Sequence, residues 1–206
     1  MPELPAGYRI PLPESRPAGL RRRRITAGTQ LWRLDADHPD QWDWTGFAEP
    51  RHRFDPPSAR FRTRYAATDL LGAFRERYRL TGLLIPGDHA GHHLVRLSAN
   101  RHLRVLDLRT ERNLDALGVD DQISTGQHDA VWTTCQQLAD AVRRWWPQPD
   151  ECPDAIVYRS RTTPETSVNY AFFAGAAFDI EAWPLQQRPD VTADLVLRHG
   201  FTVAYY

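Results

Sequence analysis

The stretch RTRYAATDLLGAFRERYR, residues 62–79, decides the fold class, because it changes from the pattern of a strand to that of a helix. Arg62–Ala66 is typical of a short strand. Thr68 can cap a helix that reaches about Arg79. The apolar stripe of that helix consists of Leu70, Leu71, Phe74 and Tyr78. We therefore expect a strand that leads directly into an amphipathic helix.

Further elements are predicted on both sides of this transition. The clearest helix runs from about His128 to Trp146, because apolar residues recur at spacings of four and three and Pro147 ends the pattern. Residues 82–91 predict a loop, and residues 194–206 predict a closing hairpin that turns at His199-Gly200. Additional strands are predicted at Thr29–Leu34, His102–Leu108, Ala155–Tyr158 and Ser167–Phe173.

The order of these elements lacks the regular βαβ rhythm of a doubly wound fold. We expect an α+β fold, with a mixed or antiparallel sheet and flanking helices, in a single domain over residues 29–206. Residues 1–28 predict an irregular arm, because prolines at positions 2, 5, 11, 13 and 17 forbid a continuous helix. The arm carries a basic run, Arg21–Arg24, which can contact RNA or an acidic partner.

The composition of the 206 residues excludes several classes of protein. The 26 basic and 26 acidic side chains balance, so no overall field attracts nucleic acid, and we do not expect nucleic acid as a partner. No apolar run approaches the roughly 20 residues of a spanning helix, so no membrane is expected. The N-terminus lacks an apolar signal core, and a cytoplasmic location is expected. Every basic residue is Arg, whose planar guanidinium suits phosphate and carboxylate groups.

Several common site motifs are missing from the chain. No GxGxxG follows a strand and no P-loop is present, so side chains would have to hold the phosphates of a bound dinucleotide. His89, His92 and His93 lack a matching set of carboxylates or cysteines, and no metal site is expected. No GxSxG surrounds Ser160, which disfavours a hydrolase nucleophile there.

Four segments, in this order, resemble the RES family, which is named for its Arg, Glu and Ser residues. They are Leu31-Trp32-Arg33, Arg53-Phe54-Asp55-Pro56, Tyr65 with Glu76 eleven residues later, and Ile156-Val157-Tyr158-Arg159-Ser160-Arg161. The resemblance covers about residues 29–175. The chain departs from the family pattern at His52, where a glycine is expected before the Arg, and in its N-terminal arm.

The resemblance implies a fold like that of ADP-ribosyltransferases and a protein that consumes NAD⁺. Some family members split NAD⁺ with inorganic phosphate, releasing nicotinamide and leaving ADP-ribose 1″-phosphate, and others transfer ADP-ribose to a protein. Members commonly act as toxins that are inhibited by an antitoxin encoded beside them. We therefore expect NAD⁺ as substrate, inorganic phosphate as co-substrate, no metal, and a helix-turn-helix antitoxin as partner.

The chemistry of NAD⁺ cleavage assigns roles to charged residues in these segments. As nicotinamide leaves, positive charge moves onto the ribose, and a fixed carboxylate can stabilise it; Glu76 is the candidate. Arg33 and Arg53 are expected to hold the diphosphate by bidentate pairing. Arg161 is expected to bind the inorganic phosphate. Glu76 is equally compatible with a surface glutamate near Arg75 or Arg79.

Two neutral residues complete the predicted site. Tyr65 is expected to stack on nicotinamide or bind the ribose, and its alternative is a core residue at a strand end. Ser160 is expected to orient a ribose hydroxyl or the carboxamide, because no His–Asp pair is evident to activate it, and its alternative is a turn cap.

Three functions follow, with phosphorolytic NAD⁺ cleavage favoured. The second is a protein ADP-ribosyltransferase that uses the same groups on a macromolecular acceptor. The third is a degenerate RES scaffold that acts as a binding module through its Arg-rich arm.

Overall fold

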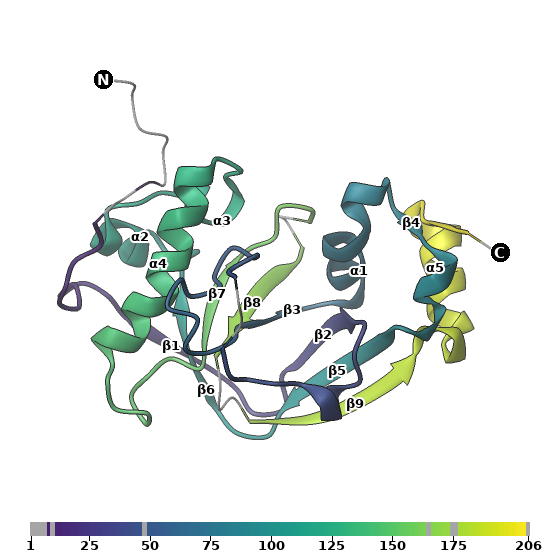
Figure 1. Cartoon of the computed structure of the whole chain (residues 1–206), viewed down its shortest axis with the longest axis horizontal. Coiled ribbons are helices and arrows are strands. Elements are labelled where there is room, and N and C mark those ends of the chain that lie inside the picture. The colour runs from purple at the N-terminus through teal and green to yellow at the C-terminus, as the bar shows by residue number, and fades with distance from the viewer. Residues whose placement is uncertain (1–7, 9–10, 47–48, 164–165, 174–176, 205–206) are drawn as a thin grey trace.

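One curled sheet organises the described chain, and helices cover it in two groups (Figure 1). The computed structural model describes residues 8, 11–46, 49–163, 166–173 and 177–204. Figure 1 shows α2, α3 and α4 over one half of the sheet and α1 and α5 over the other. The predicted α+β class, with a mixed sheet and flanking helices, is confirmed.

The elements follow each other in irregular order. The strands are β1 Arg22–Ile25, β2 Gln30–Asp35, β3 Arg64–Ala67, β4 Leu84–Ile85, β5 His93–Ala99, β6 Leu103–Asp107, β7 Ala155–Arg159, β8 Val168–Phe172, β9 Phe178–Pro184 and β10 Thr202–Val203. The helices are α1 Leu70–Tyr78, α2 Glu111–Leu117, α3 Gln122–Thr125, α4 Asp129–Trp145 and α5 Pro189–His199.

The sheet has the strand order β1-β6-β7-β8-β3-β2-β5-β9. Within it β6 and β7 are parallel, and the other recorded pairs are antiparallel. The junction of β2 with β3 is short, because only Trp32 and Ala67 are paired, whereas β2 pairs with β5 from Gln30 to Asp35. Beyond Trp32 and Ala67 the strands β2 and β3 therefore separate.

Three buried clusters form the core. The first lies under α4, whose buried residues include Val131, Cys135, Leu138, Val142 and Trp145, at the predicted spacings of four and three. The second lies on strand residues of β1, β2, β3, β5, β6, β7 and β8. The third packs α1 and α5 against β2 and β5 through residues such as Phe74, Leu94 and Leu195.

Most predicted local elements are confirmed, but the cap of α1 is not Thr68. The capping residue is Asp69, whose carboxylate accepts a hydrogen bond from the Gly72 backbone N–H at 2.7 Å. The Thr68 hydroxyl instead accepts from the Val168 N–H at 3.0 Å. Thr68 therefore ties the start of α1 to β8.

The prediction of a closing hairpin at residues 194–206 is wrong. Residues up to His199 belong to α5, which begins at Pro189, and Gly200 ends it in the left-handed conformation, with φ of 73°. Thr202–Val203 then pairs in parallel with Leu84–Ile85 of β4, inside the predicted loop. A glycine at the end of a helix resembles a hairpin turn in sequence, because both require a positive φ. Residues 205–206 lie outside the described residues.

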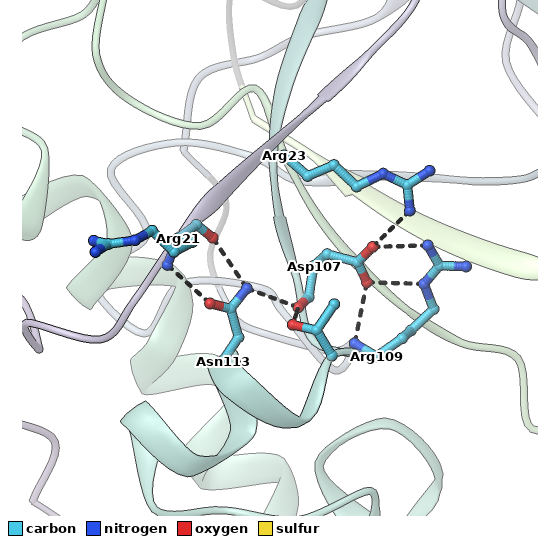
Figure 2. Close-up of polar contacts among 6 residues, drawn as sticks. Arg21, Arg23, Asp107, Arg109 and Asn113 are labelled. Atoms are coloured by element: carbon cyan, nitrogen blue, oxygen red, sulfur yellow. Dashed lines mark hydrogen bonds and ion pairs between the residues drawn. The ribbon is translucent and has the colours of Figure 1, made fainter.

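The predicted irregular arm contains a strand, so the prediction is wrong at Arg22–Ile25. These residues form β1, which pairs with β6 from Arg22–Leu106 to Ile25–Leu103. The prolines of the arm end at Pro17, and the charged run that follows them forms the sheet edge. Figure 2 shows the polar contacts that fasten this segment to the corner between β6 and α2. Residues 1–7 and 9–10 of the arm lie outside the described residues.

Candidate functional site

Glu76 and Ser160 lie in direct contact, although 84 residues separate them in the chain. The Ser160 hydroxyl donates to Glu76 Oε1 at 2.7 Å, and Asn169 Nδ2 donates to the same oxygen at 2.9 Å. The Thr162 hydroxyl donates to it at 3.3 Å. Within the described part of the chain no group donates to Oε2. One carboxylate oxygen is therefore fixed and the other remains available to a ligand.

The sheet and α1 bring these side chains together. Tyr158 on β7 pairs with Asn169 on β8, which in turn pairs with Ala67 on β3, directly before α1. A close approach of α1 is required, because a Cβ on Gly72 would lie 2.0 Å from the Ser167 hydroxyl oxygen. Gly72 therefore allows α1 to lie close enough to β8 for Glu76 to reach Asn169.

Ser160 is fully buried in a turn that follows β7. Its hydroxyl oxygen accepts from the backbone N–H groups of Thr162 and Thr163, each at 3.1 Å. The hydroxyl is thereby oriented toward Glu76, whose carboxylate accepts its hydrogen bond. Ser160 therefore organises a turn, which was its alternative role, and it also holds the Glu76 carboxylate. Its role toward a ribose hydroxyl or the carboxamide stays a prediction.

Arg161 and Arg53 lie beside the same tryptophan. Their guanidinium carbons lie 5.9 Å and 5.3 Å from the ring centroid of Trp132. Burial lowers the pKa of Arg161, the neighbouring Arg79 and Arg53 lower it further, and Glu76 opposes them. Arg161 is therefore a partly buried cation within the electrostatic reach of Glu76.

Arg53 is 5% exposed and bound to backbone carbonyl groups. Its Nη1 donates to Ile123 O at 3.0 Å, and its Nη2 donates to Gly126 O at 2.5 Å. These carbonyls belong to α3 and the residue after it. In this structure Arg53 anchors α3, and its role toward a diphosphate stays a prediction.

Tyr65 is held by a buried carboxylate, Asp55. The Tyr65 hydroxyl donates to Asp55 Oδ1 at 2.8 Å, and it accepts from the Phe54 N–H at 2.9 Å. Burial raises the pKa of Tyr65 well above its ordinary value, and the charge of Asp55 raises it further. Tyr65 therefore remains a neutral phenol in a fixed orientation.

Arg33 occupies the place where β2 and β3 separate. It pairs with Asp35, which also lies 3.5 Å from Arg64 Nη1. Burial is the main cause that lowers the pKa of Arg33. A pocket of about 370 Å³ opens here. Its lining consists of Arg33, Glu49, Arg51, His52, Asp55, Arg62, Thr63, Arg64 and Tyr65.

The predicted residues thus form two groups. Glu76, Ser160, Arg161 and Arg53 gather around the turn after β7 and Trp132, whereas Arg33 and Tyr65 line the pocket. The rings of Phe54 and Tyr158 connect the groups, with centroids 4.9 Å apart. The pKa of Tyr158 is raised mainly by burial and next by Glu76, which places Tyr158 beside the first group.

Sequence reasoning missed several residues that complete these groups. Asn169 and Thr162 hold Glu76, Asp55 holds Tyr65, and Arg64 joins Arg33. A signal existed for Asn169, because it is a single amide in the apolar strand SVNYAFF. Asp55 belongs to the predicted segment Arg53-Phe54-Asp55-Pro56, but its hydrogen-bonding role depends on Tyr65, ten residues away.

The three adjacent histidines make ring contacts with each other and their surroundings. His89 stacks on His92 with centroids 3.9 Å apart, and His93 meets His38 edge-on at 5.1 Å. Among the described residues no group of three or more His, Cys, Asp or Glu side chains is arranged to hold a metal ion. The same residues include no helix long and apolar enough to cross a membrane.

The arrangement around Glu76 suits a reaction that develops positive charge. A carboxylate fixed by neutral donors needs no rearrangement to stabilise such charge. Guanidinium groups nearby suit an anionic substrate, because they form charge-assisted hydrogen bonds with phosphate oxygens. The two groups together favour a substrate that carries both a cationic reacting centre and phosphate.

Comparisons with known proteins give one family and one fold. A family model described as the RES domain matches residues 30–195. Among solved structures, the chain is similar to a chain in the crystal structure of the M. tuberculosis MbcT-MbcA toxin-antitoxin complex. The TM-score is 0.54 and the sequence identity 16%, over 82% of this chain and 92% of that chain. At this identity the likeness shows the fold. The comparison with curated proteins found no match.

Proposed function

Because the chain belongs to the RES domain family, we propose that it cleaves the nicotinamide–ribose bond of NAD⁺ and transfers the ADP-ribosyl group to inorganic phosphate. The C–N bond breaks with its electron pair going to the pyridinium nitrogen, which becomes neutral nicotinamide. A phosphate oxygen forms the new bond to the same ribose carbon and loses its proton to solvent. The product is ADP-ribose 1″-phosphate.

The observation that carries this proposal is that the described residues engage one oxygen of the Glu76 carboxylate and leave the other for a ligand. Oε1 is held by Ser160, Asn169 and Thr162, and Oε2 is available for the ribose. An anion at this place stabilises the positive charge that develops on the sugar as nicotinamide leaves. Ser160 orients the carboxylate, and Arg161 supplies positive charge for the attacking phosphate. Tyr65 offers its ring to the nicotinamide or ribose, because its hydroxyl is engaged by Asp55 and Phe54. Arg53 is assigned to the diphosphate.

The direct test is nicotinamide release from NAD⁺ by the purified chain, with and without inorganic phosphate. We expect release that requires phosphate and a phosphorylated ADP-ribose product seen by ³¹P NMR. Release that does not require phosphate keeps the cleavage but contradicts phosphorolysis. Transfer of labelled ADP-ribose to a macromolecule identifies an ADP-ribosyltransferase instead.

Replacement of the carboxylate gives the sharper test. Glu76→Gln keeps the volume and removes the charge, so turnover is expected to fall by about 10²–10³. The thermal midpoint is expected to change little, because the glutamine oxygen can still accept from Ser160 and Asn169. Glu151→Gln, at an exposed position, is the matched control and is expected to keep wild-type turnover. Equal turnover of both variants contradicts the role of Glu76.

We further propose that the chain is a toxin with a protein antitoxin of the helix-turn-helix type. The support is its likeness to a solved chain from a toxin-antitoxin complex and the cellular cost of NAD⁺ loss. Expression of the chain in a bacterial cytoplasm is expected to deplete NAD⁺ and stop growth. The Glu76→Gln variant is expected to do neither, and co-expression of a helix-turn-helix antitoxin encoded beside the chain is expected to restore growth.

A further inference from the structure

An excess of positive charge lies where β2 and β3 separate. Arg33 and Arg64 share one carboxylate, Asp35, and the exposed fractions of the three side chains are 15%, 12% and 12%. Charges this far from water are normally paired, because an unpaired buried charge is costly. The two guanidinium groups thus share one ion-paired carboxylate, and the charge of Asp37 adds a smaller electrostatic contribution to both.

The hydrogen bonds of the two guanidinium groups are also incomplete. Nε and Nη1 of Arg33 and Nε of Arg64 are buried without a hydrogen-bond partner among the described residues. Arg64 also donates from Nη2 to Asp43 O at 2.9 Å. The ring of Trp42 lies 4.7 Å from the guanidinium carbon of Arg33 and 4.6 Å from that of Arg64. Trp42 therefore fixes both guanidinium groups in place while contributing no negative charge.

The charge of Arg33 weakens the charged state of Arg64. Burial lowers the pKa of Arg64 to about 10, and the charge of Arg33 is the next cause. Burial also lowers the pKa of Arg33. A ligand with negative charge in contact with both would reverse this effect.

The pocket beside this pair is basic as a whole. Its lining contains four arginines, Arg33, Arg51, Arg62 and Arg64, against the carboxylates of Glu49 and Asp55. The oxygens of Asp55 are already engaged: Oδ1 by Tyr65 and Thr63, and Oδ2 by the backbone N–H groups of Arg51 and His52. The pocket volume of about 370 Å³ accommodates a phosphate group with part of a larger molecule.

We propose that this pocket is a phosphate-binding subsite in which Arg64 and Arg33 together bind one phosphate group of a substrate. Its two sources are the diphosphate bridge of the dinucleotide and free inorganic phosphate, and this choice of sources rests on the proposed function. Tyr65 lies on the pocket wall and places the subsite next to the predicted nicotinamide end of the site. Trp42 acts as a positioning residue, since it contacts the guanidinium groups.

The test measures binding to the full chain by calorimetry, with ADP and inorganic phosphate as separate probes. Arg64→Met keeps the apolar stem and removes the fork, and we expect about tenfold weaker binding of the probe that uses the subsite. Weakening for ADP alone identifies the diphosphate, and weakening for inorganic phosphate alone identifies the co-substrate. Arg96→Met is the matched control, because Arg96 also stacks on tryptophans and pairs with Glu181, but lies outside the pocket lining.

A second variant tests the subsite without touching a buried residue. Glu49 is exposed on the pocket wall, so Glu49→Gln should fold normally and tighten binding of the same probe about threefold. Glu151→Gln changes the net charge equally and should leave affinity unchanged. Wild-type affinity for both probes in folded Arg64→Met overturns the proposal. If Arg64→Met does not fold, unchanged affinity in Glu49→Gln overturns it.

These binding measurements need no turnover, so they separate the subsite from the reaction. If ADP binding depends on Arg64 while the wild-type chain releases no nicotinamide, the subsite stands and the proposed function fails. If nicotinamide is released and neither probe responds to Arg64 or Glu49, the subsite alone is wrong.

Discussion

Two carboxylates, Asp55 and Glu76, show how the placement of single residues separates support from chemistry. Both oxygens of Asp55 accept hydrogen bonds, two from hydroxyls and two from backbone N–H groups. From the described residues, Glu76 accepts hydrogen bonds through one oxygen, and the donors are Ser160, Thr162 and Asn169. A carboxylate whose two oxygens both accept hydrogen bonds stabilises a loop. A carboxylate with one engaged oxygen can still act on a ligand through the other.

We expect Asp55→Asn to destabilise the chain by about 2 kcal/mol. An amide offers one acceptor oxygen, so its NH₂ group would face donors that now lose their partner. The measurement is the urea midpoint of unfolding. Asp140→Asn is the control, because Asp140 accepts from Ser58 at the surface, and its loss should be smaller. Equal losses would show that the Asp55 network contributes no more than a surface contact.

The buried thiol of Cys135 makes stability depend on pH. Burial raises its pKa from 9.0 to about 11, and Arg53 opposes this shift more weakly. Between these values the folded chain keeps the proton that the unfolded chain releases. The free energy of unfolding should therefore fall as pH rises from 9 to 11, by at most about 1.4 kcal/mol per pH unit for this group.

Urea unfolding of the wild type and of Cys135→Ala at pH 8.5 and 10.5 checks this dependence. The variant should lose less stability over this interval, since it has no thiol to titrate. Burial also raises the pKa of Tyr78, to about 12, and that contribution is common to both proteins. An identical loss in both would contradict the assignment to Cys135.

At the scale of elements, the close contact between α1 and the segment before β8 positions the site. Asp69 caps α1, Thr68 bonds to Val168, and Gly72 meets Ser167 where no side chain fits. These neighbouring residues set the position of α1, and with it the distance from Glu76 to Ser160 and Asn169. The position of Glu76 in the site therefore depends on the approach of α1 to β8 as well as on its place along the helix.

We expect Gly72→Ala to separate α1 from β8. The added Cβ would lie 2.0 Å from Ser167 Oγ and 2.8 Å from Ser167 Cβ, so the helix must shift. Stability should fall by about 1–3 kcal/mol, and turnover should fall more than the folded fraction explains. Gly91→Ala is the matched control, because nothing lies within 4 Å of its added Cβ.

A second substitution that removes the clash separates the steric shift of α1 from other effects of Gly72→Ala. Ser167→Gly removes the two nearest of the three atoms that the new Cβ meets and leaves only Ala67 Cβ at 3.3 Å, so Gly72→Ala/Ser167→Gly should recover turnover relative to Gly72→Ala. Thermal denaturation and nicotinamide release measure the two effects. No recovery in the double variant would contradict the role of this contact.

Sequence patterns predicted elements well where the pattern and the packing are both local. The helix α4 is confirmed because its apolar stripe is also its buried face, and the strands β2, β6, β7 and β8 follow the predicted segments closely. The hairpin at the C-terminus is wrong because Gly200 ends a helix and the chain then pairs with β4. Strand pairing between distant segments cannot be read from a local glycine.

At the scale of the whole molecule, the N-terminal segment extends the sheet beyond the residues that match the family. β1 pairs with β6, while the family model begins at residue 30. The Asn113 side chain donates to Arg21 O at 3.0 Å and accepts from Arg21 N at 2.8 Å (Figure 2). Arg23 also lies 3.1 Å from the buried carboxylate of Asp107. The segment thus protects a sheet edge that would otherwise be open to pairing.

We expect Asn113→Ala to lower stability by about 1–3 kcal/mol, because it leaves backbone groups of Arg21 without partners. Deletion of residues 1–28 should cost more, since it also exposes the apolar surface covered by Leu12, Leu20 and Ile25. Thermal denaturation and light scattering measure stability and association. Asn100→Ala, at a surface contact 3.4 Å from Asp179, is the control and should have little effect. A deletion variant as stable as the wild type would contradict this role.

The sequence by itself determined the α+β class, the helices α1 and α4, most strands of the sheet, and the family to which the chain belongs. These follow from residue periodicity and motif order, which are set by near neighbours along the chain. Only the tertiary structure decided which oxygen of Glu76 is held, that Arg53 anchors α3, that Asp55 fixes Tyr65, and that Arg33 and Arg64 share Asp35. Each of these depends on strand register and helix approach between segments far apart, and an arginine-rich chain gives no local signal for which guanidinium groups share an anion.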